Sequence, residues 1–539
     1  MSERATSMVA CPEPLAAAIG AEILARGGNA VDAGVATAFG QTVANPLMAS
    51  LGGCAQCLVY AARASAAELV QASPVSGSGA VPGVYTPAGE DAIPGIVGSG
   101  RRVAGDRNLM THAASVIPTL VRGLEAAHAR YGSMPWAELV APAIQLARDG
   151  LTVTPYLYRT WDPDRPHPMG VRPSDKIAAQ PEARKIFMPE GRLLRVGERL
   201  VQRDLARTLE RVAHEGPRVF YDGEIAEEIG HDFEAHGGLF TTADLRWAAP
   251  SLERPTTGSY RGYTLVTDAP PGLGVILLLI MQVCERLDLR ALGWNTPAYF
   301  DVVARTLQWA FAEAAEVLRT GSSDGAAALL DPARVLAVRD AVLSGAFPSV
   351  ASTGGSREGT THLAVMDREG NAASWVHSSG SGSGVVTPGL GFVHNDHMIM
   401  FDPRAGRLGS IAPRAVPVHG GGPVILLRDG RRAMAIGSPA GALKTTAIAQ
   451  VLLSVLEFGL PLQAAVSAPR LHTQHEAAVV MVEPSFPSGI ARALGRMGHR
   501  VIVNDYTARV SAILDTGEGL VGAADPRGGG GLEWTSESG

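Results

Sequence analysis

The sequence predicts an α+β protein, because helical and strand patterns occupy different parts of the chain. The first 340 residues hold long stretches with apolar residues at helical spacing and only short strand patterns. After Thr360, polar and apolar residues alternate in THLAVMD, DREGN supplies turn residues, and AASWV resumes a strand. This pattern predicts a β-hairpin over residues 361–376, with Thr360 at the leading end of its first strand.

Helices are expected at three places in the first part of the chain. Residues 13–29 show helical spacing and stop at a pair of glycines, which suits the end of a helix. Longer helical patterns cover 111–150 and 200–236. Single glycines at positions 132, 150 and 216 interrupt these patterns and predict breaks between successive helices.

The longest apolar run, GVILLLIMQV from Gly274 to Val283, predicts a buried helix. It has about half of the ~20 residues that a membrane span needs. The start of the chain, MSERAT, lacks the basic and apolar regions of a secretory signal. We therefore expect a cytoplasmic protein with no membrane partner.

Composition favours small-molecule chemistry. The chain has 539 residues, of which 46% are hydrophobic and 18% charged, enough to bury one large core or two moderate ones. Its 46 basic and 52 acidic residues are spread along the chain and give a formal charge of -6. No basic stripe for nucleic acid is present in the sequence, so we expect a small-molecule substrate and no nucleic-acid partner.

The four cysteines are too few for a disulfide framework in a chain of this length. Cys54 and Cys57 form a C-x-x-C pair, which could indicate a redox or metal site. Their surroundings, SLGGCAQCLVY, are apolar and rich in glycine, with no second pair of ligands. We expect two buried structural thiols.

Three further segments complete the organisation of the chain. Residues 346–359 are small and polar, and predict an exposed, flexible connector before Thr360. AMAIGSPAG followed by ALKTTAIAQVLLSVLEFG predicts a strand, a glycine turn and a long helix, with backbone N–H groups at the helix start. The last twelve residues, GGGGLEWTSESG, are expected to fray.

Several stretches, from residue 13 to about 527, together resemble the gamma-glutamyltranspeptidase family. They are ILARGGNAVDAGVATA, YGSMPWAELVAPAIQLARDG, FYDGEIAEEI, GGLFTTADL, SYRGY, EGTTHLAVMDREGNA, IGSPAG and SAPRLH. The resemblance implies a four-layer αββα sandwich of the N-terminal-nucleophile hydrolase type, and a precursor that cuts itself before a threonine. It implies no cofactor.

Matching TTH places the cut between Gly359 and Thr360. The products would be a large subunit, 1–359, and a small subunit, 360–539, associated in one intertwined domain. A threonine hydroxyl needs a base within reach, and the cut supplies an α-amino group whose pKa is typically about 7.7 to 8. Gly359 tolerates the strained geometry that the attack requires. The alternative is that Thr360 and Thr361 are ordinary strand residues, since threonine is common in strands.

The resemblance implies roles for further residues. Ser378 falls where the family has a second hydroxyl bonded to the nucleophile, although SSGSGSG also suits a flexible loop. Ala440 and Gly441, in GSPAG, fall where two backbone N–H groups stabilise the oxyanion, an effect worth roughly 3 to 4 kcal/mol per donor. Thr361 and Asn371 match family positions that we assign to substrate binding, although a turn asparagine needs no function.

The part of the pocket that would hold a glutamyl head departs from the family. Val70, in LVQASP, stands where the family has an arginine, and His419 and Gly420 stand where two serines grip the carboxylate. His397 and Met400 replace the glutamine and aspartate that bind the ammonium. A glutamyl substrate would keep unpaired buried charges, costing several kcal/mol, so we expect a different acyl group.

Polar residues that remain near this pocket in the sequence are His394, Asp396, His397, Arg414 and His419. The spacing in H-N-D-H is not a recognised zinc pattern, so we expect no metal there. We expect these histidines to donate hydrogen bonds to a carboxylate or keto group of the substrate; otherwise they are structural.

The resemblance therefore predicts a self-processing hydrolase or acyltransferase. Related enzymes include cephalosporin acylases, an oxamate amidohydrolase, and antibiotic-pathway enzymes that release an oxalyl-type unit by C–C cleavage. We expect a non-glutamyl amide or an activated C–C acyl substrate, oxalyl- or oxamate-like or a biosynthetic intermediate. A gamma-glutamyltransferase or glutathione hydrolase, and a non-catalytic binding protein, are the alternatives.

Overall fold

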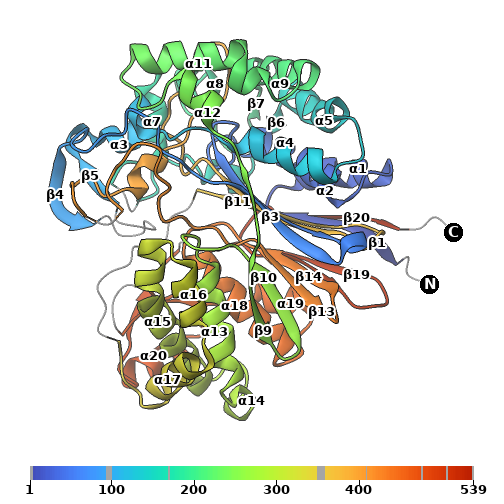
Figure 1. The fold of residues 1–539 in the computed structure, drawn as a ribbon, viewed down its shortest axis with the longest axis vertical. Coiled ribbons are helices and arrows are strands. Elements are labelled where there is room, and N and C mark those ends of the chain that lie inside the picture. The colour runs from blue at the N-terminus through green and yellow to red at the C-terminus, as the bar shows by residue number, and fades with distance from the viewer. Residues whose placement is uncertain are drawn as a thin grey trace.

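Helices and antiparallel sheets form four layers, in the order helix, sheet, sheet, helix (Figure 1). The computed structural model describes residues 4–92, 100–167, 170–348, 359–407, 409–474, 478–505 and 508–536. This arrangement confirms the predicted α+β class and the αββα sandwich. Of the connector expected at 346–359, residues 349–358 lie outside the described ranges.

Within the described ranges, seven strands form the sheet that carries Thr360. Every neighbouring pair in it is antiparallel. In spatial order the strands are β20 (Gly531–Ser536), β1 (Ala5–Cys11), β11 (Thr361–Met366), β12 (Ala372–Ser378), β2 (Cys54–Ala61), β3 (Ala66–Ala72) and β8 (Ser251–Glu253). Strands from before and after residue 360 are therefore interleaved in one sheet.

The second sheet packs face to face against the first. Its strands, among the described residues, are β19 (Leu520–Ala524), β18 (Ser511–Asp515), β14 (Arg431–Gly437), β13 (Val424–Arg428), β10 (Tyr263–Thr267) and β9 (Thr256–Tyr260). Apolar side chains from both sheets, such as Leu58, Met366 and Ile513, are buried between them. Because side chains alternate between the two faces of a sheet, the residues next to these along each strand point toward the helical layers.

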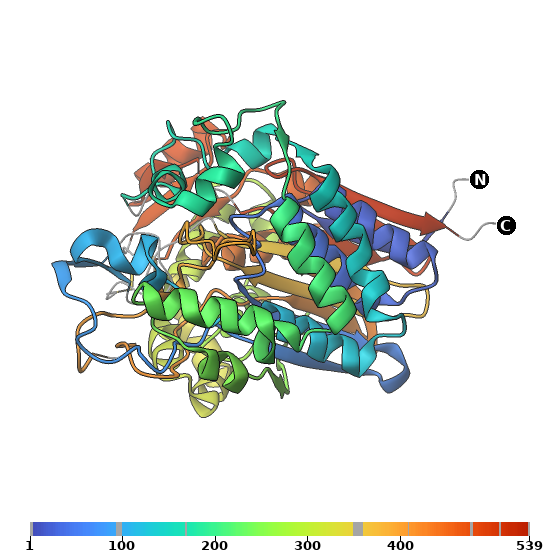
Figure 2. The same ribbon diagram turned by 90° about the horizontal axis from the view of Figure 1, so that it is seen from above.

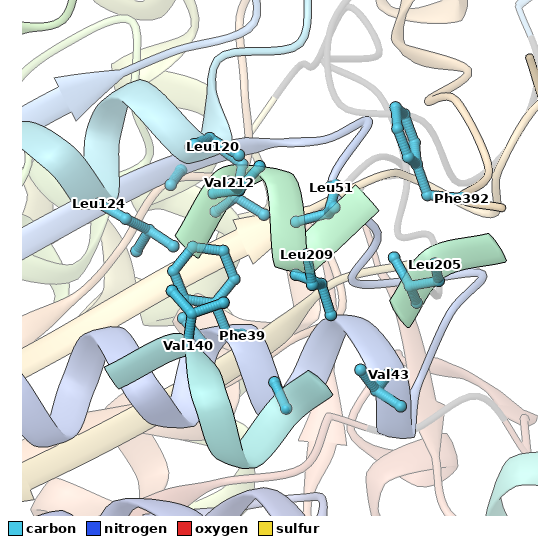
Figure 3. Close-up of a cluster of buried hydrophobic side chains, with 14 of the residues drawn as sticks. Phe39, Val43, Leu51, Leu120, Leu124, Val140, Leu205, Leu209, Val212 and Phe392 are labelled. Atoms are coloured by element: carbon cyan, nitrogen blue, oxygen red, sulfur yellow. The ribbon is translucent and has the colours of Figure 1, made fainter. Parts of the chain in front are cut away.

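One helical layer covers the seven-stranded sheet, as the view from above shows (Figure 2). Its main helices are α1 (Pro14–Ala25), α2 (Ala30–Ala44), α4 (Leu120–Tyr131), α5 (Trp136–Asp149), α9 (Arg203–Glu215) and α11 (Glu224–Ala235). Phe39 of α2, Val140 of α5 and Leu209 of α9 meet in the core of this layer (Figure 3). The helices predicted at 13–29, 111–150 and 200–236 are confirmed, with breaks at Gly132, Gly150 and Gly216.

The other helical layer covers the six-stranded sheet. It contains α13 (Gly274–Glu285), α15 (Pro297–Thr320), α17 (Pro332–Leu343) and α18 (Leu443–Leu456). The apolar run at 274–283 is the buried helix that the sequence predicts, packed between the sheet and its neighbours. None of the helices in the described ranges combines the length and apolar character that crossing a membrane requires.

The two local structures expected after residue 360 are present. Strands β11 and β12 form the predicted hairpin, with Thr361 paired to His377. Strand β14 leads through GSPAG into α18, which confirms the strand, turn and helix.

The expectation that the C-terminal residues fray was wrong. Residues 531–536 form β20, which pairs along its whole length with β1 at the edge of the sheet. The hydrogen-bonding partner lies more than 500 residues away in the sequence, so the local composition of glycines and polar residues gave no sign of it.

Candidate active site

The hairpin places two hydroxyl groups next to each other. Thr360 directly precedes β11, and Ser378 is the last residue of β12, so the strand register sets them opposite each other. Thr360 Oγ1 donates a hydrogen bond to Ser378 Oγ at 3.2 Å. Only 9% of Thr360 is exposed, so the pair is largely shielded from bulk water.

Gly359 adopts a conformation that only glycine accommodates here. Its φ is +142°, and a Cβ atom would lie 2.2 Å from the carbonyl oxygen of Gly380. The hydroxyl of Ser378 donates a hydrogen bond to the carbonyl oxygen of Gly359. The peptide bond between Gly359 and Thr360 thus has a hydroxyl donor on its carbonyl and a second hydroxyl next to it.

A cavity of about 70 Å³ lies beside this pair. Its walls come from β2, β12, the short helix His397–Met400, the segment 419–421 and the start of α18. The residues predicted from the sequence that line it are Gly359, Thr360, Ser378, His397, Met400, His419, Gly420 and Gly441. No aspartate or glutamate is among its described lining residues.

The turn between β14 and α18 borders the cavity. Ala440 has φ +91° and Gly441 has φ +50°, and Gly441 lines the cavity. A positive φ is unfavourable for alanine by roughly 1 to 3 kcal/mol, and such strain is concentrated at functional sites. The N–H groups that precede a helix have no partner within it, which makes this turn a suitable anion site.

Two histidines face the cavity. His397 Nε2 lies 3.4 Å from Ser378 Oγ, and its Nδ1 lies 3.7 Å from Cys54 Sγ. His419 Nε2 lies 3.4 Å from Ser73 Oγ. Burial, reinforced by the charge of Lys444, lowers the pKa of His419 to about 4, so this ring is neutral at physiological pH.

Lys444 is the important lining residue that the sequence analysis missed. It is the second residue of α18, its surface is 2% exposed, and its Nζ donates to the carbonyl oxygen of Gly421 at 2.6 Å. Burial lowers the pKa of Lys444 to about 8, with Asp268 opposing the shift, so the ammonium form prevails below that pH. The sequence holds one sign of this role, because Lys444 is the single charged residue of α18.

Asp268 is the acidic group that influences Lys444, and it lies behind the cavity wall. Burial raises the pKa of Asp268 to about 6, although the charge of Lys444 acts in the opposite direction. Asp268 and Lys444 attract each other without forming a direct ion pair among the described residues. The described walls of the cavity themselves therefore carry a cation and no acidic residue.

Two predicted substrate-binding residues lie away from the cavity. Thr361 points to the opposite face of the sheet, where its hydroxyl donates to Glu13 and accepts from Gln41, both at 2.8 Å. Asn371 lies in the turn at the far end of the hairpin, where its side chain bonds Asp367 and the N–H of Ala62. Both side chains are hydrogen-bonded within the fold, and neither lines the cavity.

Other residues expected near the cavity also have structural roles. Val70 is buried in the core. Further along the same segment, Ser73 contacts His419 and Pro74 lines the cavity. His394 packs on Phe233 and contacts the hydroxyl of Thr387, Asp396 pairs with Lys176, and Arg414 stacks on Trp247. These polar groups are partnered within the protein and do not line the cavity.

Cys54 and Cys57 are free and buried, as predicted. Burial raises the pKa of the Cys54 thiol to about 12 and raises that of Cys57 further. Cys54 also forms part of the cavity wall, opposite Ser378 in the strand register.

Comparisons with known proteins agree with this geometry. Residues 16–534 match the family model for gamma-glutamyltranspeptidase. The chain is 33% identical over 534 residues to an acylase ACY 1 proenzyme of Pseudomonas sp. (strain V22), covering 96% of this chain and 91% of that protein. It is 30% identical over 547 residues to a glutathione hydrolase proenzyme of Escherichia coli (strain K12), covering 96% and 90%.

A solved cephalosporin acylase from Bacillus halodurans has the same fold, with a TM-score of 0.84 at 27% identity, covering 99% of this chain and 97% of that one. The whole-length match to the family model, the similarity to two proenzymes and this fold lead to one conclusion. The chain belongs to the gamma-glutamyltranspeptidase family, and is an enzyme of the hydrolase and acyltransferase type with the N-terminal-nucleophile fold.

Proposed function

We propose that Thr360 is the nucleophile of a self-processing hydrolase or acyltransferase, and that the chain cuts itself between Gly359 and Thr360. The observation that carries this proposal is the contact of 3.2 Å between Thr360 Oγ1 and Ser378 Oγ at the cavity. The conformation of Gly359 and the proenzyme names of both relatives support it. The products, 1–359 and 360–539, stay together as one domain.

After the cut, the free α-amino group of Thr360 takes the proton from its own hydroxyl. Thr360 Oγ1 then attacks the substrate carbonyl, while Ser378 holds the attacking oxygen through their hydrogen bond. The N–H groups of Ala440 and Gly441 stabilise the oxyanion that forms. When the oxyanion collapses, the bond from the acyl carbon to the leaving nitrogen or carbon breaks, and the α-ammonium of Thr360 returns its proton to the leaving group. The resulting ester on Thr360 passes its acyl group to water or to an amine.

We propose a compact, anionic and oxygen-rich acyl group, such as an oxalyl- or oxamate-like unit, released from an amide or an activated C–C bond. Lys444 supports this choice, because a buried ammonium without an ion pair gains most from a substrate carboxylate. Neutral His419 can donate a hydrogen bond to a keto or carboxylate oxygen.

A γ-glutamyl substrate fits these walls less well. Its α-ammonium would enter a cavity whose described lining holds a lysine and no acidic residue. The presence of an acylase and a cephalosporin acylase among the similar proteins also favours an acyl group other than glutamyl.

A gamma-glutamyltransferase or glutathione hydrolase is the second candidate, favoured by the relative from Escherichia coli. Purified protein should be assayed with matched anilides of oxalic acid and of γ-glutamate. We expect turnover of the oxalyl anilide to exceed that of the glutamyl anilide at least tenfold in kcat/KM. Faster release from the glutamyl anilide would assign the second candidate instead.

Gel electrophoresis and mass spectrometry test the nucleophile and exclude a non-catalytic binding role. We expect two bands from the 56.1 kDa chain, with a new N-terminus at Thr360, and a substrate-derived acyl group trapped on that residue. Thr360→Ala should stay uncut. A wild-type chain that remains a single inactive band would overturn the proposal.

A further inference from the structure

Three metal-ligating side chains meet outside the cavity, where the C-terminal end of α11 approaches the short helix His112–Ala114. Ligand atoms of His112, Asp232 and His236 all lie within 4.8 Å of one another. We propose that these residues bind a late first-row divalent ion, of which Zn²⁺ is the best match. The proposal is independent of the acyl-transfer chemistry.

Two distances within this group, from each histidine to one oxygen of Asp232, are close to the separation of ligands around a tetrahedral ion. His112 Nε2 lies 3.3 Å from Asp232 Oδ2, and His236 Nδ1 lies 3.0 Å from Asp232 Oδ1. Ligands about 2.0 to 2.2 Å from a tetrahedral zinc ion are separated from each other by roughly 3.3 Å. Asp232 and His236 are four residues apart at the end of one helix, so the backbone fixes their spacing.

The two imidazole rings lie next to each other, with centroids 4.7 Å apart and planes that differ by 17°. His236 is the more exposed of the two, at 58% against 13% for His112, so its ring has room to turn its nitrogen toward an ion.

Asp232 is held in place by a group that does not bind the ion. Its side chain is 8% exposed, and Thr387 Oγ1 donates to its Oδ2 at 2.8 Å. Hydrogen bonds of this kind orient a ligand and strengthen metal binding. Thr387 follows Thr360 in the sequence, so the ion would connect the two predicted subunits through this bond.

The types of ligand atom in this group favour one kind of metal ion. Two imidazole nitrogens and one carboxylate oxygen suit Zn²⁺, whereas Mg²⁺ and Ca²⁺ prefer oxygen ligands alone. His236 is 58% exposed, so water can fill the fourth position. His236 Nδ1 also lies 2.8 Å from the carbonyl oxygen of Asp232. An ion bound at Nδ1 would replace this contact.

The helix His112–Ala114 packs against the helix His397–Met400, which lines the cavity. An ion at this site would therefore brace one wall of the cavity from behind. We expect the ion to raise thermal stability without taking part in the acyl-transfer reaction.

Full-length protein without a histidine tag, treated with a chelator, should be titrated with ZnCl₂, CoCl₂ and MgCl₂. We expect about one equivalent of Zn²⁺ to bind by calorimetry, visible absorption bands of four-coordinate Co²⁺, a higher Tm with Zn²⁺, and no response to MgCl₂.

His236→Ala should weaken Zn²⁺ binding at least tenfold, and Asp232→Asn should remove the Co²⁺ bands. His231→Ala is the matched control, because His231 is exposed on the same helix and outside the group. The site is disproved if wild-type protein binds no Zn²⁺, or if His231→Ala and His236→Ala bind it equally.

Discussion

Lys176 Nζ and Asp396 Oδ2 form an ion pair of 2.7 Å whose side chains are 1% and 0% exposed. Lys176 also donates to Ser381 Oγ and to the carbonyl oxygen of Gly382. These bonds hold α7 (Pro173–Ala179) against the loop that precedes His397. One wall of the cavity therefore depends on a charge pair that has almost no contact with water.

Lys176→Met should lower the free energy of unfolding by about 3 to 5 kcal/mol, because it removes the cation that faces the buried carboxylate of Asp396. Denaturant titration measures the change. Lys185→Met is the control, since Lys185 and Glu182 form an exposed pair whose loss should change stability by less than about 1 kcal/mol. Equal effects of the two substitutions would contradict the role of burial.

Gly359→Ala should leave the precursor uncut, because its Cβ would collide with the carbonyl oxygen of Gly380. Gly345→Ala provides the comparison: Gly345 also has a positive φ, +76°, but a Cβ atom there meets nothing within 4 Å. Time courses on denaturing gels would follow processing of both variants. If Gly359→Ala is cut at the wild-type rate, the geometry at this bond does not control cleavage.

Thr361→Val should reduce stability and leave KM unchanged. The valine has a similar shape but removes the hydroxyl between Glu13 and Gln41, a loss of about 1 to 3 kcal/mol for a bond to a charged group. Thr361→Ser, which keeps the hydroxyl, should stay close to wild type. Thermal unfolding and Michaelis curves on the processed enzyme separate the two effects, and a raised KM for Thr361→Val would restore a role in binding.

Activity on an anionic acyl group should fall as pH rises through about 8, because burial lowers the pKa of Lys444 to about 8 and the ammonium is lost above it. A neutral acyl anilide should stay active above this pH. At lower pH, activity on both substrates should rise with pH as the α-amino group of Thr360 loses its proton. Profiles of kcat/KM for wild type and Lys444→Met would show the difference. The same falling limb in Lys444→Met would rule out Lys444 as its origin.

The parts of the site that the sequence predicted are those built by local structure. Thr360, Ser378 and Gly441 were matched through the family resemblance, and they lie in a hairpin and a strand–turn–helix junction that periodicity and turn residues predict. Thr361 lies outside the cavity because successive side chains of a strand point to opposite faces of the sheet. Asn371 lies outside it because a strand of six residues places the turn roughly 20 Å from Thr360.

The remaining features depend on contacts between distant segments. Lys444 becomes a wall of the cavity only because residues 419–421 fold over its ammonium group. His394 and His397 are three residues apart, yet one packs into the core and the other faces the cavity. Their sequence neighbourhood is the same, so only tertiary packing separates their roles.

The strand order of the seven-stranded sheet has a consequence for a chain that is cut before Thr360. In the order β20, β1, β11, β12, β2, each fragment supplies strands that lie between strands of the other. Separating the fragments would break the ladders on both sides of β1 and the ladder between β12 and β2. Dilution therefore cannot dissociate the cut protein without unfolding it, and fragments 1–359 and 360–539 made separately would have to fold together, strand by strand, to give active enzyme.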